Sequence, residues 1–104
     1  MSIKTKFFDW DEKNINKNRD KHKVKSGECE EIFLNEPLIL ADVDKSKILY
    51  REDRHIAYGI TNSHRLLFVV FIIRHEKIRV ISARDMNKKE RGFYYEEAKR
   101  FDKV

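Results

Sequence analysis

The sequence predicts an α+β domain in which an antiparallel sheet of about four strands is combined with two N-terminal helices and one C-terminal helix. Two observations indicate this class. Apolar residues recur at helical spacing before Pro37 and at strand spacing after it. The segments between most of the expected strands are short, which favours antiparallel neighbours. At 104 residues, the chain is expected to form a single domain over residues 1–104.

The first helix is expected to run to about His22. Asp9 and Glu12 have the spacing of a capping box, in which side chains satisfy backbone N–H groups at the start of a helix. The apolar face of this helix is thin, with Trp10 and Ile15 and little more. We therefore expect this helix to lie on the surface with only one narrow side packed against the rest of the domain.

A second helix is expected over residues 27–35, with Ser26 as its N-cap. Cys29, Ile32 and Phe33 lie at positions i, i+3 and i+4, so they form one apolar stripe. Pro37 ends this helix because proline cannot continue the hydrogen-bond ladder.

Strands are expected after Pro37, over residues 38–43, 54–61, 65–74 and 77–84, with a final helix over residues 87–101. Polar connections separate them, over residues 44–53, 61–64 and 75–76. The third strand contains eight consecutive apolar residues, Leu66–Ile73, and should lie centrally with cover on both faces. In the second strand, alternation places Ile56, Tyr58 and Ile60 on one face, and His55, Ala57 and Gly59 on the other.

The composition favours a polyanionic or acidic partner, although only weakly, because many small domains are basic. The net charge is +5, and residues 75–104 hold nine Lys and Arg against six Asp and Glu. Cys29 is the only cysteine, which excludes an internal disulfide and fits a reducing compartment. The apolar run Leu66–Ile73 is far shorter than the roughly 20 residues that span a bilayer. We expect a cytoplasmic protein without a membrane segment or secretory signal.

The expected fourth strand carries arginines within an apolar run, which is uncommon for a buried strand. Arg79 and Arg84 lie on it, and the helix that follows carries Glu90 and Tyr94. A guanidinium is a planar, permanent cation that matches phosphate oxygens, so RNA is the first ligand to consider. The alternative has equal weight: both arginines are paired with carboxylates such as Asp85.

Each of the other candidate residues also has a structural interpretation. Glu90 is a possible general base, but it also has capping spacing with Asn87, and both roles can coexist. Tyr94 can stack on a base or bind phosphate, whereas core packing is the favoured interpretation. Lys21 and His22 suit proton transfer, but a cation pair that interacts with the helix dipole is favoured.

No metal or cofactor site is expected. His55, His64 and His75 show no metal-ligand spacing with one another, with His22 or with Cys29. The sequence also lacks a glycine-rich phosphate loop, a Gly-x-Ser-x-Gly elbow and a Cys-x-x-Cys pair. Nucleotide-driven and serine-hydrolase chemistries are therefore poorly supported.

The sequence resembles the BrnT toxin family of small bacterial proteins. The matching segments, in order, are Phe8–Lys13, Lys21–His22 with Val24, Glu30–Phe33, Arg54 with Ala57–Gly59, and Ile78–Arg84 with Glu90, Arg91 and Tyr94. One departure is Lys23, which stands where the family usually has glycine. The resemblance implies a RelE-like fold and a toxin of a type II toxin–antitoxin pair. It also implies an endoribonuclease that stops translation, and a BrnA-like antitoxin with a ribbon-helix-helix part, in a complex that represses its own operon.

The first hypothesis is a metal-independent endoribonuclease. Arg79 and Arg84 would neutralise the phosphate, His22 or Glu90 would take the proton from the 2′-hydroxyl, and Lys21 or Tyr94 would assist at the leaving oxygen. The residues expected to bind the RNA backbone are Arg54, Lys88, Lys89 and Arg91. The second hypothesis is a non-enzymatic binder of RNA or of another partner, including a toxin that acts on gyrase, as some RelE-fold relatives do.

Overall fold

The computed structural model describes residues 7–41 and 54–102, and in this part it contains three helices and one four-stranded sheet. The helices are α1 (Glu12–His22), α2 (Ser26–Leu34) and α4 (Lys88–Asp102). The strands are β1 (Leu38–Ala41), β2 (His55–Ile60), β3 (Leu66–Arg74) and β4 (Lys77–Asp85). The sheet has the order β1-β2-β3-β4, and all neighbours are antiparallel. The predicted α+β class and element order are confirmed, while the expected connector at 44–53 lies outside the described residues.

Helix α1 begins two residues later than the capping pattern predicted. Its N-cap is Asp11, whose carboxylate accepts hydrogen bonds from the backbone N–H of Lys13 at 2.8 Å and of Asn14 at 3.3 Å. The expectation that Asp9 caps this helix is wrong. Its backbone N–H instead donates to the Ile78 carbonyl at 2.9 Å, because the segment around Phe8 forms a bridge with β4.

Helix α2 packs its predicted apolar stripe against the sheet. Cys29, Ile32 and Phe33 are all buried, as expected. The N-cap, however, is Lys25 and not Ser26; the Lys25 backbone N–H donates to the Glu28 carboxylate at 3.0 Å.

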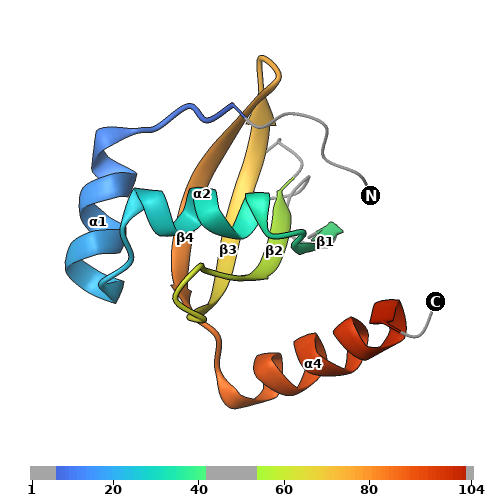
Figure 1. Cartoon of the computed structure of the whole chain (residues 1–104). Helices are drawn as coiled ribbons and strands as arrows, with labels where there is room; N and C mark the ends of the chain where they lie inside the picture. Colours follow the sequence, from blue (N-terminus) through green and yellow to red (C-terminus); the bar gives the residue numbers. More distant parts are fainter. Residues whose placement is uncertain (1–6, 42–53, 103–104) are drawn as a thin grey trace.

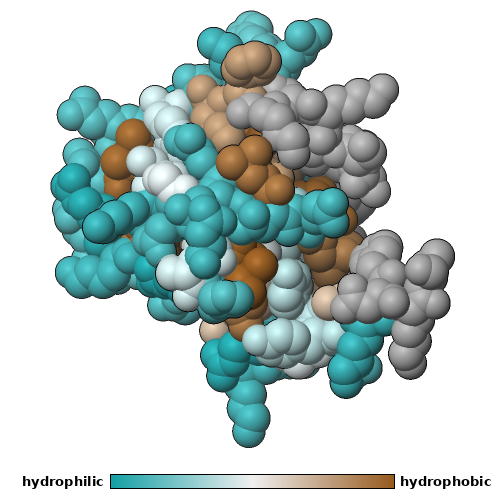
Figure 2. All heavy atoms as spheres, viewed as in Figure 1, coloured by the Kyte–Doolittle hydropathy of each residue, from teal (hydrophilic) through white to brown (hydrophobic). Residues whose placement is uncertain are grey.

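The core lies between one face of the sheet and the two N-terminal helices, and α4 leaves from the end of β4 (Figure 1). The buried apolar cluster comprises Val24, Cys29, Ile32, Phe33, Ala57, Leu67, Val69, Phe71, Ile78, Val80 and Ala83. Burial along β2 alternates as predicted, with His55, Ala57 and Gly59 on the covered face. The outer surfaces of α1 and α2 are mostly hydrophilic, with hydrophobic patches beside α2 (Figure 2).

The second face of the sheet is less covered than predicted. The apolar side chains that β3 presents there, those of Leu66, Phe68 and Val70, are only half-buried within the described part of the chain. Helix α4 reaches this face through Phe93, whose ring centroid lies 5.5 Å from that of Tyr58. This open face therefore keeps apolar and charged side chains within reach of solvent.

Helix α1 runs along the outer edge of β4 and satisfies its backbone groups. The Lys17 ammonium donates to the Ile81 carbonyl at 2.8 Å, and the amide oxygen of Asn18 accepts from the Ala83 N–H at 3.2 Å. Asn18 is only 3% exposed, so this second bond is shielded from water. An edge strand with unpaired N–H groups invites pairing with other chains, and α1 closes this edge. No helix within residues 7–41 and 54–102 is long and apolar enough to cross a membrane.

Candidate active site at the end of strand β4

Arg84 and Glu90 form a bidentate ion pair where β4 leads into α4. Arg84 Nη1 lies 2.8 Å from one carboxylate oxygen of Glu90, and Nη2 lies 3.0 Å from the other. Glu90 also accepts the Asn87 backbone N–H at 2.9 Å, while the Asn87 side chain accepts the Glu90 N–H at 2.8 Å. The predicted capping box is thus confirmed, and Glu90 contacts the arginine as well. The guanidinium of Arg84 lowers the pKa of the Glu90 carboxyl, so this group is ionised at neutral pH.

Aromatic rings surround this ion pair on the open face of the sheet. The Arg84 guanidinium carbon lies 4.0 Å from the centre of the Phe68 ring, which is a cation–π geometry. Tyr58 packs edge-on between Phe68 and Phe93, with ring centroids 5.4 and 5.5 Å away. Burial raises the pKa of Tyr58, and the negative charge of Glu90 raises it further. The arginine is therefore held in an environment of rings and one carboxylate.

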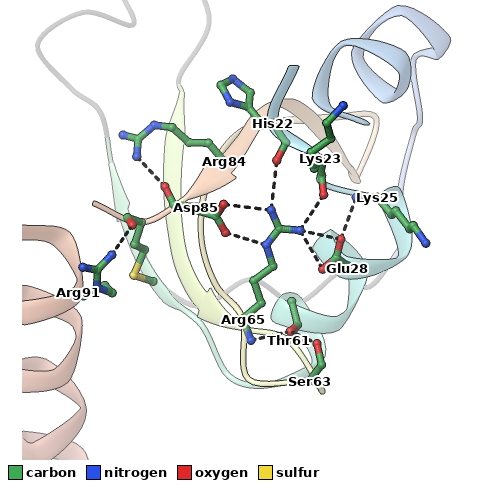
Figure 3. Close-up of polar contacts among 11 residues, drawn as sticks. His22, Lys23, Lys25, Glu28, Thr61, Ser63, Arg65, Arg84, Asp85 and Arg91 are labelled. Carbon is green, nitrogen blue, oxygen red and sulfur yellow. Dashed lines mark hydrogen bonds and ion pairs between the residues drawn. The ribbon is translucent and has the colours of Figure 1, made fainter. Parts of the chain in front are cut away.

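Asp85 joins this pair to a second charged cluster (Figure 3). The Asp85 backbone carbonyl accepts from Arg84 Nη1 at 3.1 Å, and its carboxylate binds Arg65 at 2.7 and 3.1 Å. Hydrogen bonds from Arg65 lower the pKa of Asp85, and the charge of His22 lowers it further. The His22 carbonyl accepts from Arg65 Nη2 at 3.1 Å, so the end of α1 lies at the same end of β4 as Asp85 and Arg84 (Figure 3).

The structure does not bring Arg79 to Arg84. Arg79 Nη2 binds the carboxylate of Asp11 at 2.7 Å, at the start of α1. The β3 partners of the two arginines, Ile72 and Phe68, are four positions apart. The two arginines are therefore separated by roughly 13 Å along the sheet, at about 3.3 Å per residue. Both are paired with carboxylates, as one interpretation of the sequence expected, but the partners are Asp11 and Glu90 and not Asp85.

The other predicted site residues are spread over the molecule. Lys21 is exposed on the last turn of α1, and Tyr94 lies against Tyr95 on α4, with ring centroids 5.9 Å apart. Burial raises the pKa of Tyr94. Arg54 precedes β2 at the end of the sheet that holds Arg79.

The basic side chains of the first turns of α4 remain at the surface. Lys88 and Lys89 are exposed, and Arg91 Nη1 donates to the Met86 carbonyl at 3.0 Å. These side chains follow the Arg84–Glu90 pair closely in the sequence, so they place positive charge on the first turns of α4 beside it.

Sequence reasoning missed Arg65 and Tyr58 as site residues. Arg65 stands between a turn and an apolar strand, and its partners come from three other segments of the chain, so spacing gave no signal for them. Strand alternation did place Tyr58 on one face of β2 with Ile56 and Ile60, but that face is apolar in composition, so it gave no signal of a charged site.

Within the described ranges, no group of three His, Cys, Asp or Glu residues is placed to hold a metal ion. The thiol of Cys29 is 1% exposed, and burial raises its pKa to about 12. The interpretation of Cys29 as a small core residue is confirmed.

The architecture is shared with a solved toxin. The structure described as "1.1 Angstrom-resolution crystal structure of the Brucella abortus ribonuclease toxin, BrnT" superposes with a TM-score of 0.61 and 23% sequence identity. The match covers 81% of this chain and 100% of that one. The protein therefore has the α+β fold of a small ribonuclease toxin.

The sequence itself identifies the family. A family model described as "Ribonuclease toxin, BrnT, of type II toxin-antitoxin system" matches residues 10–90. The chain belongs to this family, and it is a ribonuclease toxin of a type II toxin–antitoxin system with an antitoxin as its partner. A comparison with curated protein sequences gives no match.

Proposed function

We propose that this toxin cleaves RNA without a metal ion and that Arg84 stabilises the charge that develops on phosphorus. The observation that carries this proposal is the fixed orientation of Arg84 by Glu90 and Phe68. A guanidinium has five N–H groups, and the described contacts of Arg84 with Glu90 and the Asp85 carbonyl use three of them. One N–H on Nη2 and the N–H on Nε are left for phosphate oxygens. A cation that is oriented before the reaction needs little reorganisation in the transition state.

The reaction begins when the RNA 2′-hydroxyl attacks the adjacent phosphorus. A bond forms between the 2′-oxygen and phosphorus, the bond to the 5′-oxygen breaks, and the products carry a 2′,3′-cyclic phosphate and a 5′-hydroxyl. His22 is the preferred acceptor of the 2′-hydroxyl proton. Glu90 is the weaker choice, because its carboxylate is occupied by Arg84 and its pKa is lowered. Lys21 or Tyr94 supplies the proton to the leaving 5′-oxygen.

The RNA backbone extends from Arg84 in two directions. Arg79 and Arg54 lie at the far end of the sheet, where they would bind neighbouring phosphates. Lys88, Lys89 and Arg91 on α4 add affinity on the other side.

Membership of the family supports a proposal for the biological role. Cleavage of RNA stops translation in the cytoplasm, and a BrnA-like antitoxin with a ribbon-helix-helix part neutralises the toxin. Operator DNA is bound only through the toxin–antitoxin complex. Co-purification of the toxin with the product of a neighbouring ribbon-helix-helix reading frame tests this role, and loss of cleavage on complex formation is the expected result.

Incubation of the purified protein with RNA in EDTA tests the chemistry. Products with 2′,3′-cyclic phosphate ends are expected. Products that form only when divalent metal is restored, or that carry 3′-hydroxyl ends, would contradict the mechanism.

The role of Arg84 requires a variant with a matched control. Arg84→Ala should lower kcat by about 10²–10³-fold, because it removes an oriented charge from the transition state. RNA binding should be nearly retained. Arg19→Ala removes an arginine of α1 whose side chain is 56% exposed, and its cleavage should equal that of the wild type. An equal loss of binding and cleavage in Arg84→Ala would indicate that the arginine contributes affinity only.

A further inference from the structure

We propose that Arg65 is a positioning residue of the active site, which holds His22 at the end of β4 beside Asp85 and Arg84. The inference rests on the proposed role of His22 in proton transfer. It concerns a residue that touches neither the phosphate nor the reacting oxygens.

Arg65 makes an unusually complete set of contacts for one side chain. Its Nε and Nη2 bind the Asp85 carboxylate at 2.7 and 3.1 Å, and its Nη1 binds both oxygens of Glu28 at 3.1 and 3.2 Å. Nη1 also donates to the Lys23 carbonyl at 2.7 Å, and Nη2 donates to the His22 carbonyl at 3.1 Å. All five guanidinium hydrogens have an acceptor within reach.

These contacts join the end of α1 and the first turn of α2 to the end of β4, which is far from both in the sequence (Figure 3). The His22 and Lys23 carbonyls end α1, Glu28 lies in the first turn of α2, and Asp85 ends β4. Lys23 has φ 57°, a left-handed conformation that turns the chain away from α1. Arg65 holds this turn by its carbonyl, so it adds a side-chain link between the end of α1 and the end of β4 to the contacts that Lys17 and Asn18 make along the helix.

The contacts also connect His22 to the proposed catalytic cation. Arg65 binds the His22 carbonyl on one side and the Asp85 carboxylate on the other, and the Asp85 carbonyl accepts from Arg84 at 3.1 Å. The Arg65 side chain is 25% exposed, and the hydrogen bonds that it donates to Asp85 raise its pKa, so its charge is permanent. Lysine is a poor replacement, because its three N–H groups sit on one nitrogen and cannot reproduce five donors that are spread over a planar fork.

A double-mutant cycle with Arg65→Lys and His22→Ala tests the inference. Arg65→Lys should lower kcat on a short RNA by about 10–100-fold and leave KM within about 3-fold, because a misplaced proton acceptor affects the chemical step. In the His22→Ala background, Arg65→Lys should lower kcat by less than about 3-fold. An equal loss in both backgrounds would mean that Arg65 only supports the fold, and it would overturn the inference.

Two further measurements make the result decisive if Arg65→Lys folds poorly or the protein is inactive. Glu28→Gln keeps an acceptor oxygen but weakens the hold on Arg65, so it should cause a smaller loss of kcat that also vanishes with His22→Ala. In proton NMR of Arg65→Lys or Glu28→Gln, the His22 ring signals should move while those of His75, on the distant turn between β3 and β4, should not. Unmoved His22 signals would overturn the inference whatever the activity.

The failures of the two proposals are distinguishable. An inactive wild type contradicts the proposed function but leaves the NMR test of Arg65 intact. Unchanged cleavage by His22→Ala overturns the positioning role and assigns the proton to Glu90, but it leaves the proposed role of Arg84 standing. An active wild type and a slow His22→Ala variant without coupling to Arg65 overturn the positioning role alone.

Discussion

The guanidinium of Arg84 lies over the ring of Phe68, with its central carbon 4.0 Å from the ring centre. Because the same cation binds Glu90 through two nitrogens, its position is defined both by a ring and by a carboxylate. The ring fixes the height of the cation above the sheet, and the carboxylate fixes its direction. Phe68 is thus part of the machinery that orients Arg84, although it carries no charge.

Phe68→Leu should therefore lower cleavage more than it lowers stability. The substitution keeps an apolar side chain in a half-buried site, so the free energy of unfolding should fall by only about 1 kcal/mol. We expect kcat to fall by about 10-fold, because the cation loses one of its two supports. Phe7→Leu is the control, since Phe7 is 73% exposed. Cleavage by Phe68→Leu at the wild-type rate would show that Glu90 alone orients Arg84.

Lys23→Gly should stabilise the protein. Lys23 follows α1 with φ 57° and ψ 33°, a conformation that costs an L-residue with a Cβ atom about 1 kcal/mol and costs glycine almost nothing. Glycine at this position should raise the free energy of unfolding by about 0.5–1 kcal/mol in urea titrations. Lys21→Gly, inside α1, should lower it by about 1 kcal/mol. A destabilised Lys23→Gly variant would contradict this account of the turn.

Acid should destabilise the protein through Glu90 and Asp85. Arg84 lowers the pKa of Glu90 below its ordinary value of 4.5, and Arg65 lowers the pKa of Asp85 below 3.8. The folded state therefore binds these protons more weakly than the unfolded state. This contribution to stability is fully present above the ordinary pKa values of the two carboxyl groups. It is lost as the pH falls through the lower pKa values that the same groups have in the folded protein. Glu90 should contribute more, because its side chain is 15% exposed and that of Asp85 is 62% exposed.

The measurement is the free energy of unfolding between pH 7 and pH 3, by urea titration. The wild type should lose stability below about pH 4.5, and Glu90→Gln should lose less over the same interval. Glu96→Gln is the matched control, because its side chain is 75% exposed on the same helix. Equal acid sensitivity in Glu90→Gln and the wild type would contradict the assignment.

Gly59→Ala should be destabilising. A Cβ atom at position 59 would lie 2.7 Å from the Cβ of Ile32, which belongs to α2 and is fully buried. The helix would have to move away from the sheet, at a cost of about 1–3 kcal/mol. Gly92→Ala in α4 has open space within 4 Å and should stabilise by about 0.5–1 kcal/mol. Thermal unfolding of both variants checks the difference in sign.

Much of the fold could be predicted from local patterns. Two periodic patterns in the sequence predicted burial correctly. One is the helical spacing of Cys29, Ile32 and Phe33 in α2, and the other is the two-residue alternation in β2. The helix starts were less predictable. Asp9 had capping spacing, but its N–H pairs with β4, and this contact involves a residue 69 positions later. The sequence also did not predict that the second face of β3 is only partly covered. The apolar composition of a strand does not show how closely a later helix, here α4, packs against it.

The site could be predicted only in part, for the same reason. Arg84 and Glu90 are six residues apart, so the sequence placed them together. The contact of Arg79 with Asp11 spans 68 positions, and nothing in the spacing within β4 shows it. Arg65 depends on carbonyl groups of α1, which every residue possesses and no side-chain pattern reveals. Local capping chemistry was therefore visible in the sequence, whereas contacts between distant segments were not.

Helix α1 also sets a limit on how members of this family can change in length. It has eleven residues, or roughly 16 Å of helix, and the strand from Arg79 to Asp85 covers roughly 20 Å. The two elements therefore meet at both ends, at Asp11 and at His22. One residue inserted in the middle of α1 would turn one end by roughly 100° relative to the other and detach it from the strand. An insertion in the hairpin at His75 and Glu76 would leave α1 and its contacts with β4 in place, so we expect natural length variation to be more frequent there than in α1.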